Sequence, residues 1–135
     1  MQTRIIPRDE WVEFFESFSR EHEGSLVTLE VPSHQKVVTA RLADYVEAEH
    51  LAFGGVTAEL NVDGEDRIEV MVGEKAADHV THNVAAPTEV SLDRTDDGAD
   101  MALRIKASDE TVTVLRILSP MLPEMVDGIV AESRV

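Results

Sequence analysis

The sequence predicts an α+β fold: a mostly antiparallel β-sheet of about eight strands, curled or forming a partly closed barrel, packed by an N-terminal amphipathic helix and a short C-terminal helix. Helical spacing of apolar residues is confined to the two ends of the chain, whereas residues 25–118 alternate between apolar and polar side chains, as half-buried strands do. A length of 135 residues is that of one domain, so we expect a single domain over residues 1–135.

Residues 7–23 carry the pattern of an amphipathic helix. Pro7 suits the first turn of a helix, and Gly24 suits the residue that follows the last turn. Spacings of three, four and seven place four aromatic side chains on one face: Trp11, Phe14, Phe15 and Phe18. Each ring can remove roughly 150 to 250 Å² of surface from water, so we expect this face to cover the sheet.

Period-two alternation predicts the strands in the middle of the chain. An irregular stretch with Glu47, Glu49 and His50 is interpreted as a loop or bulged connection. The run at 111–118 is apolar on both faces, which predicts a central strand covered on both sides, and a short helix or turn follows at 119–130. The other expected strands lie at 27–31, 38–42, 56–62, 68–72 and 78–86, and around 90–92 and 103–105.

Two hairpin registers follow from the residues that must share the buried face. In the first hairpin, a three-residue loop sets Leu60 opposite Ile68, whereas a two-residue turn would set Leu60 opposite the charged Arg67, so we expect the three-residue loop. In the second hairpin, an even loop centred on Asp97 and Gly98 places four apolar residues opposite one another: Val90 with Ile105, and Leu92 with Leu103.

The composition narrows the classes of function. The sequence has no cysteine, which excludes disulfides, thiolate catalysis and zinc–thiolate sites. A formal net charge of -15 repels phosphate backbones and anionic lipids, so we expect no binding to nucleic acid or to a membrane. The composition is compatible with a protein partner and with a homo-oligomer. The first residues lack the apolar stretch of a signal peptide, so we expect a soluble cytoplasmic protein, and no motif indicates a cofactor.

Short segments along nearly the whole chain carry a resemblance to known sequences. The early ones are Ile6-Pro7-Arg8-Asp9-Glu10-Trp11, Phe14-Phe15, Phe18-Ser19-Arg20 and His22-Glu23-Gly24. The later ones are Asp78-His79, Thr81-His82, Ala86-Pro87-Thr88, Asp97-Gly98-Ala99-Asp100, Leu122-Pro123-Glu124 and Val126-Asp127-Gly128. Together they resemble a small bacterial family of unknown function. The resemblance implies a single-domain protein, and it implies no activity, ligand or catalytic residue.

The segment 78–82 brings two histidines and a carboxylate close together in the sequence, as a histidine-based metal or acid–base site requires. Asp78, His79 and His82 are therefore the candidate catalytic residues, and His79 and His82 are the candidate metal ligands. On a strand, however, residues 79 and 82 point to opposite faces. The alternative is that His82 is a core histidine with a hydrogen-bond partner and that His79 is a surface residue.

Two acidic turns imitate parts of a calcium-binding loop, which needs oxygen ligands at alternate positions. The first contains Asp93, Thr95, Asp97 and Gly98. Arg104 stands at the twelfth position, where such a loop needs a bidentate Glu, so a tight turn is the better interpretation. The second, interpreted as a solvated turn, contains Asn61, Asp63, Glu65 and Asp66.

The remaining motifs leave three hypotheses of function. His22-Glu23 could begin a zinc-protease motif, but Leu26 stands where the second histidine is required. The leading hypothesis is a non-catalytic cytoplasmic accessory or interaction module. The first alternative is a small hydrolase or isomerase that uses His79 or His82 with a carboxylate such as Asp78, Asp63 or Asp66. The second is a carrier whose curled sheet encloses a small apolar ligand.

The acidity of the chain generates a prediction about salt. Nine Arg and three Lys beside 27 acidic residues fit either a host with a salty cytoplasm or an ordinary protein of a GC-rich genome. If carboxylate repulsion opposes folding, potassium chloride should raise the Tm as the Debye length falls from about 30 Å at 0.01 M to about 3 Å at 1 M. Thermal unfolding over this range measures the effect, and a constant Tm would favour genome composition.

Overall fold

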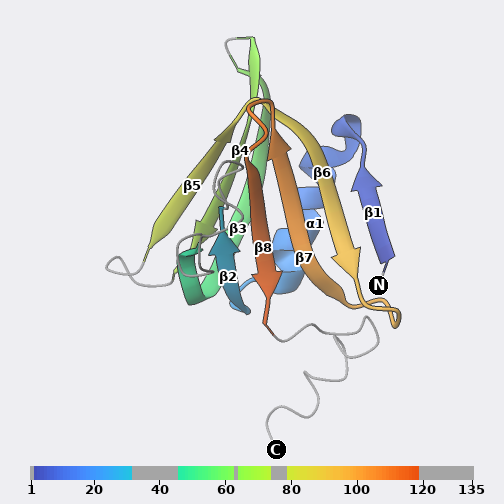
Figure 1. The fold of residues 1–135 in the computed structure, drawn as a ribbon, viewed down its shortest axis with the longest axis vertical. Helices are drawn as coiled ribbons and strands as arrows, with labels where there is room; N and C mark the ends of the chain where they lie inside the picture. Colours follow the sequence, from blue (N-terminus) through green and yellow to red (C-terminus); the bar gives the residue numbers. More distant parts are fainter. Residues whose placement is uncertain (1, 32–45, 63, 74–78, 119–135) are drawn as a thin grey trace, which may run out of the picture.

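The structure of the protein, a computed structural model, describes residues 2–31, 46–62, 64–73 and 79–118. These residues form one antiparallel sheet of eight strands that curls without closing, with a helix packed against it (Figure 1), which confirms the expected α+β fold. The strand order is β1-β6-β7-β8-β2-β3-β4-β5. In chain order the elements are β1 (Gln2–Ile6), the 3-10 turn η1 (Arg8–Glu10), α1 (Trp11–His22), β2 (Leu26–Glu30), β3 (Val46–Val62), β4 (Glu65–Val72), β5 (Val80–Ala85), β6 (Pro87–Arg94), β7 (Asp100–Ala107) and β8 (Val112–Ile117).

The expected N-terminal helix is present as η1 followed by α1. The buried residues of α1 are Trp11, Phe15, Phe18 and His22. The indole Nε1 of Trp11 donates a 2.9 Å hydrogen bond to the carbonyl oxygen of Ile6, which fixes β1 relative to the helix. As expected, Gly24 ends the helix: its φ is +86°, and its N–H donates a 2.9 Å hydrogen bond to the carbonyl oxygen of Phe53 in β3.

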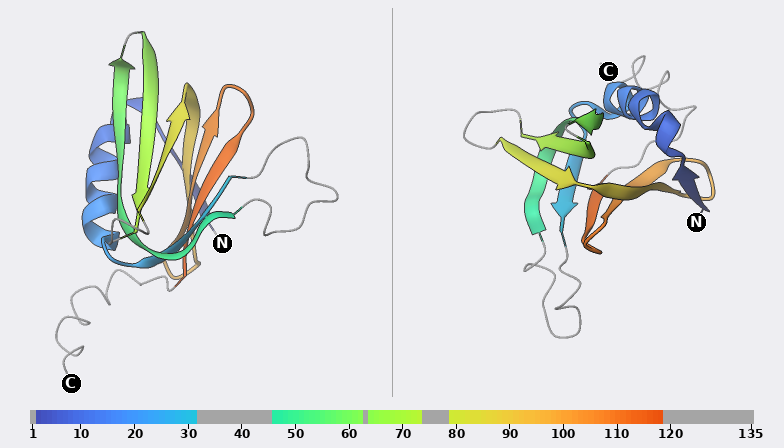
Figure 2. Two further views of the ribbon diagram at one scale, coloured as in Figure 1. Left: turned by 90° about the vertical axis from the view of Figure 1, so that its left-hand side faces the viewer. Right: turned by 90° about the horizontal axis from the view of Figure 1, so that it is seen from above.

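Two segments run through both halves of the sheet and make it curl. The strand β3 pairs with β2 along its first half and with β4 along its second half. At this bend a Cβ on Gly54 would lie only 3.1 Å from the carbonyl oxygen of Met71, so a glycine allows β4 to approach. Strand β5 pairs with β4, and beyond Ala86 (φ +51°) the chain continues as β6, which pairs with β7 and β1. Figure 2 shows the curl, with α1 between β3 and β1.

The first hairpin differs from expectation, and the segment before it follows one of the two alternatives. The stretch with Glu47, Glu49 and His50 belongs to β3 and is not a loop, and the register shifts in its pairing with β2 agree with the bulged alternative. In the β3–β4 hairpin Ala58, not Leu60, lies opposite Ile68, so the expected register is wrong by two residues. Val62 pairs with Glu65, and therefore two residues connect the strands where we expected three.

A β-bulge explains this hairpin. The register shifts between Glu59 and Val62, where Asn61 has a φ of +61°. The backbone N–H of Asn61 donates a 3.0 Å hydrogen bond to Oδ1 of Asp66, which holds the extra residue in place. The bulge adds one unpaired residue to β3 between Glu59 and Val62. Because of this extra residue, the apolar side chains of both strands stay on the buried face although only two residues connect the strands.

The second hairpin confirms the expected register in its core and differs at its end. Val90 pairs with Ile105 and Leu92 with Leu103, as expected. A bulge between Asp93 and Arg94 then shifts the register, so that Arg94 lies opposite Asp100. The N–H of Thr95 donates a 2.9 Å hydrogen bond to the carbonyl oxygen of Ala99, so the loop is not the even turn that was expected.

The remaining strands show where sequence patterns succeed and fail. Strand β8 lies near the centre of the sheet, and its adjacent residues Val114 and Leu115 are both buried, which confirms the expected central position. Strand β1 was not expected, because four of its five residues are exposed and give no buried alternation. The strand expected at 38–42 and the helix or turn expected at 119–130 lie outside the described residues. In the described part of the chain, no helix is both long and apolar enough to cross a membrane.

The buried aromatic face of α1 generates a stability prediction. Phe18 is 2% exposed, and its ring lies 5.6 Å from that of Phe53, centroid to centroid. Replacing Phe18 with Ala should lower the free energy of unfolding by about 3 to 5 kcal/mol, because the substitution removes buried apolar surface and leaves a cavity. Denaturant titration measures this loss. Val12→Ala, on the exposed face of the same helix, is the control, and equal losses in both variants would contradict the packing argument.

Candidate functional site

An open cavity of about 350 Å³ lies between α1, β1 and the ends of β6 and β7. Residues at a spacing of four along α1 form one wall, because they lie on the same face of the helix. They are Glu13, Ser17 and Glu21, and the ring of Phe14 lies beside them. The opposite wall carries Arg4 of β1, Arg94 of β6 and Asp100 of β7.

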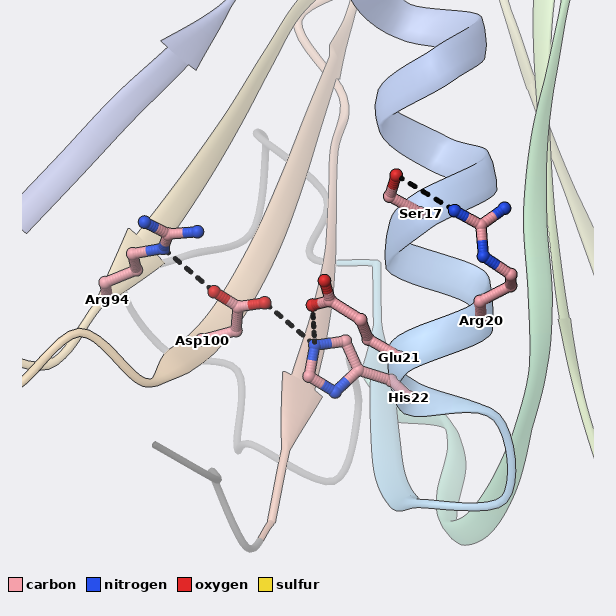
Figure 3. Close-up of polar contacts among 6 residues, drawn as sticks. All are labelled: Ser17, Arg20, Glu21, His22, Arg94 and Asp100. Atoms are coloured by element: carbon pink, nitrogen blue, oxygen red, sulfur yellow. Dashed lines mark hydrogen bonds and ion pairs between the residues drawn. The ribbon is translucent and has the colours of Figure 1, made fainter. Parts of the chain in front are cut away.

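A buried polar network forms one end of this cavity. The Nε2 atom of His22 lies 2.8 Å from Oδ2 of Asp100, and Nε of Arg94 donates a 2.9 Å hydrogen bond to Oδ1 of Asp100. The side chains of His22 and Asp100 are only 7% and 9% exposed. Figure 3 shows Asp100 between Arg94 and His22, with the carboxylate of Glu21 next to the same imidazole nitrogen.

The charge state of Asp100 fixes the direction of the hydrogen bond. Burial favours the neutral acid, but the hydrogen bonds from His22 and Arg94, together with electrostatic attraction to the same two groups, outweigh burial and lower the pKa of Asp100 below its ordinary value. The carboxyl group is therefore ionised at neutral pH and can only accept hydrogen bonds. The proton shared with His22 consequently lies on Nε2, which donates to Oδ2 of Asp100.

Three potential metal ligands converge at this point. The Oε1 atom of Glu21 lies 3.9 Å from Nε2 of His22, and one donor atom each from Glu21, His22 and Asp100 fall within 4.8 Å of one another. Within the described ranges, this is the group of three His, Asp or Glu side chains whose geometry could hold an ion.

The charges of the cavity are only partly balanced. Arg4 pairs with Glu10 at 3.3 Å, and Arg94 pairs with Asp100 at 2.9 Å. Glu13 makes no ion pair with any described residue, and Glu21 is 3.9 Å from the imidazole of His22. Two carboxylates on α1 thus face the cavity without a guanidinium partner.

The two candidate histidines, His79 and His82, have separate hydrogen-bond partners. His79 is exposed, and its Nε2 lies 2.9 Å from Oγ1 of Thr81. His82 is half-buried on β5, and its Nε2 lies 3.0 Å from Oγ1 of Thr113, which is on β8 and 1% exposed. Because β5 and β8 are not neighbours in the sheet, this bond crosses the interior of the curl. Thr113 supplies the partner expected for a core histidine, and Asp78 lies outside the described residues.

Asp66, another carboxylate expected as a catalytic candidate, is bound to an arginine. Nε and a terminal nitrogen of Arg8 donate hydrogen bonds of 2.7 and 2.8 Å to the two oxygens of Asp66. These bonds, together with the N–H of Asn61, lower the pKa of Asp66 to about 2. The pair connects η1 to β4, which is a structural role, and Asp63 lies outside the described residues.

The segment that imitates a calcium loop is a turn, as expected. Arg104, at the position of the missing Glu, donates a 2.7 Å hydrogen bond from Nε to Asp93. Thr3 of β1 donates a second bond of 2.8 Å to the same carboxylate. Burial raises the pKa of Asp93, but these two hydrogen bonds and the charges of Arg104 and Arg116 together lower it below its ordinary value. Asp93 therefore serves as an ion-pair partner within the sheet.

Sequence reasoning missed the network at His22 and Asp100. A signal for His22 was available, because it continues the buried helical spacing of Trp11, Phe15 and Phe18 and a buried imidazole needs a polar partner. We considered His22 only as part of an incomplete zinc-protease motif and therefore did not assign it to the buried face of the helix. No local pattern indicates Asp100, which is 78 residues away in the sequence.

Comparison with known proteins identifies a family without an assigned activity. The model of a family of unknown function (DUF5335) matches residues 2–125. No curated protein and no solved structure matches the chain significantly.

The buried network generates a second stability prediction. Asp100→Asn should lower the free energy of unfolding by about 1 to 3 kcal/mol, because the amide cannot accept both hydrogen bonds as the carboxylate does and leaves a buried group poorly paired. Denaturant titration at neutral pH measures the change. Asp97→Asn, an exposed position in the same hairpin, is the control. A cost for Asp100→Asn no larger than that of the control would show that the network contributes nothing to folding.

Proposed function

Since the chain belongs to the DUF5335 family of unknown function, its role has to be inferred from its own side chains, and we propose that it is a non-catalytic cytoplasmic binding module. The cavity between α1 and β1 is the binding site in this proposal, and a basic segment of a partner protein is its ligand. The observation that carries the proposal is the pair of unbalanced carboxylates, Glu13 and Glu21, beside an aromatic ring in an open cavity.

The shape and the apolar part of the cavity support a peptide side chain as the ligand. A volume of about 350 Å³ that is open to solvent can admit one or two side chains without enclosing a whole small molecule. Phe14 is half-buried and lines this space. The hydrocarbon stem of a lysine can pack along such a ring, and its ammonium group gains from the negative face of the ring.

The cavity and the whole chain both carry negative charge that can attract a cationic ligand. The two positive groups in the wall, Arg4 and Arg94, are already paired with carboxylates, so Glu13 and Glu21 remain for a ligand cation. The formal net charge of -15 attracts a basic partner over a longer range and increases its rate of association.

The two alternative functions have less support. A hydrolase or isomerase of this kind would need His79 or His82 beside a carboxylate such as Asp66. The two oxygens of Asp66 accept hydrogen bonds from Arg8, and the rings of His79 and His82 lie beside the hydroxyl groups of Thr81 and Thr113. A carrier would need an apolar cavity inside the curl. Large side chains fill that space, among them Trp11, Phe15 and Phe53.

The binding proposal predicts a charge-selective interaction. An acetylated and amidated Lys-Gly-Lys-Gly-Lys peptide should bind the full chain, and its Glu-Gly-Glu-Gly-Glu counterpart should not. Glu13→Gln should weaken binding of the lysine peptide by up to about fivefold, since exposed ion pairs contribute about 0.2 to 1 kcal/mol. NMR titration of backbone amides measures the Kd and locates the perturbed residues.

The matched control is Glu89→Gln, which removes the same charge from an exposed position at the far end of β6. It should leave the Kd unchanged. Equal weakening by both substitutions, or amide shifts spread over the whole surface, would show general attraction to an acidic protein and would contradict a site at α1.

A further inference from the structure

We propose that Glu21, His22 and Asp100 form a binding site for a divalent transition metal ion, with Zn²⁺ as the best-fitting ion. This inference goes beyond the peptide-binding function, because it concerns a different ligand and adds the buried His22 and Asp100 to Glu21, which both proposed sites share. Its donor set is one imidazole nitrogen and two carboxylate oxygens, which are established zinc ligands.

The two distances from His22 to the carboxylates are close to those around a coordinated ion, and all three donor atoms lie within 4.8 Å of one another. Metal–ligand bonds of about 2.0 to 2.1 Å in a tetrahedron place the ligand atoms about 3.3 Å apart. The Nε2 atom of His22 lies 2.8 Å from Asp100 and 3.9 Å from Glu21. To reach this spacing, the distance from His22 to Asp100 must lengthen by about half an ångström and the distance from His22 to Glu21 must shorten by about as much. A small shift of Asp100 and a rotation of the Glu21 side chain can supply these changes.

The groups around the three donor atoms also suit a bound ion. Arg94 donates to Oδ1 of Asp100, so Oδ2 is oriented towards His22 and remains the oxygen available to a metal. Such a hydrogen bond to a ligating carboxylate is the usual second interaction in metal sites. Both carboxylates also line the cavity, whose water can occupy a fourth coordination position.

Charge favours the ion despite the nearby guanidinium. Two carboxylates against one arginine give the ligand group a negative balance, and Glu21 is 55% exposed and has no arginine partner among the described residues. The cost is the hydrogen bond between His22 and Asp100, because a neutral imidazole that binds the ion through Nε2 carries its proton on Nδ1 instead. The nitrogen and the oxygen of that bond then both become ligands, so neither is left unpaired.

Glu21→Gln is the informative variant, because an exposed side chain can be replaced without disturbing the fold. Calorimetric titration of the full chain with Zn²⁺ should show one site per chain in the wild-type protein. Glu21→Gln should weaken this site at least tenfold, since even partners outside the ligand shell change affinity about 10- to 100-fold. Zn²⁺ should also shift the NMR resonances of the His22 ring.

Glu13→Gln is the control, since it removes an acidic side chain from the same cavity wall without touching the three ligands. It should keep the zinc affinity of the wild type while it weakens the lysine peptide, so the two proposals can fail separately. The inference is overturned by the absence of saturable binding at one ion per chain, by equal weakening in Glu13→Gln and Glu21→Gln, or by loss of the site in His79→Ala or His82→Ala.

Discussion

The burial of one face of α1 against the curled sheet is the constraint on which the rest of the structure depends. Phe18 contacts Phe53 of β3. The imidazole of His22 lies one turn further along, tilted against the ring of Phe18 at a centroid distance of 4.6 Å. Apolar packing therefore determines where a polar side chain is buried. Once His22 is in the core, a partner such as Asp100 is required, since an unpaired buried imidazole would oppose folding. The aromatic face and the polar network are parts of one arrangement.

Four arginines of this acidic protein pair with carboxylates that are more buried than the arginines themselves. Four guanidinium–carboxylate pairs have N–O distances between 2.7 and 2.9 Å: Arg8 with Asp66, Arg94 with Asp100, Arg104 with Asp93 and Arg116 with Glu30. Each arginine is between 39% and 49% exposed, so its charge is partly solvated while its partner is more buried. Acidic residues outnumber basic ones by 27 to 12, so the surface carries an excess of negative charge. Such a surface suits cationic ligands, either an ion or a basic side chain.

The fold could be predicted where a local pattern has one physical cause. The spacing of Trp11, Phe15 and Phe18 predicted the helix, and the alternation at Val90 and Leu92 predicted the register of a hairpin. The same reasoning gave the right buried face but the wrong register for the β3–β4 hairpin, because a bulge can restore the face at a different loop length. Strand β1 gave no signal, since its place in the sheet comes from pairing with β6 and not from burial of its side chains.

The sequence by itself determined the helix, the antiparallel strands, the absence of thiol chemistry and the strongly negative charge, because each of these follows from composition or from periodicity over a few residues. The tertiary structure decided the candidate site. Asp100 reaches His22 only because a bulge after Asp93 changes the end of the β6–β7 hairpin and because α1 lies between β3 and β1. Periodicity specifies which face of an element is buried, but not which distant residue it meets there. That pairing depends on the curl of the whole sheet.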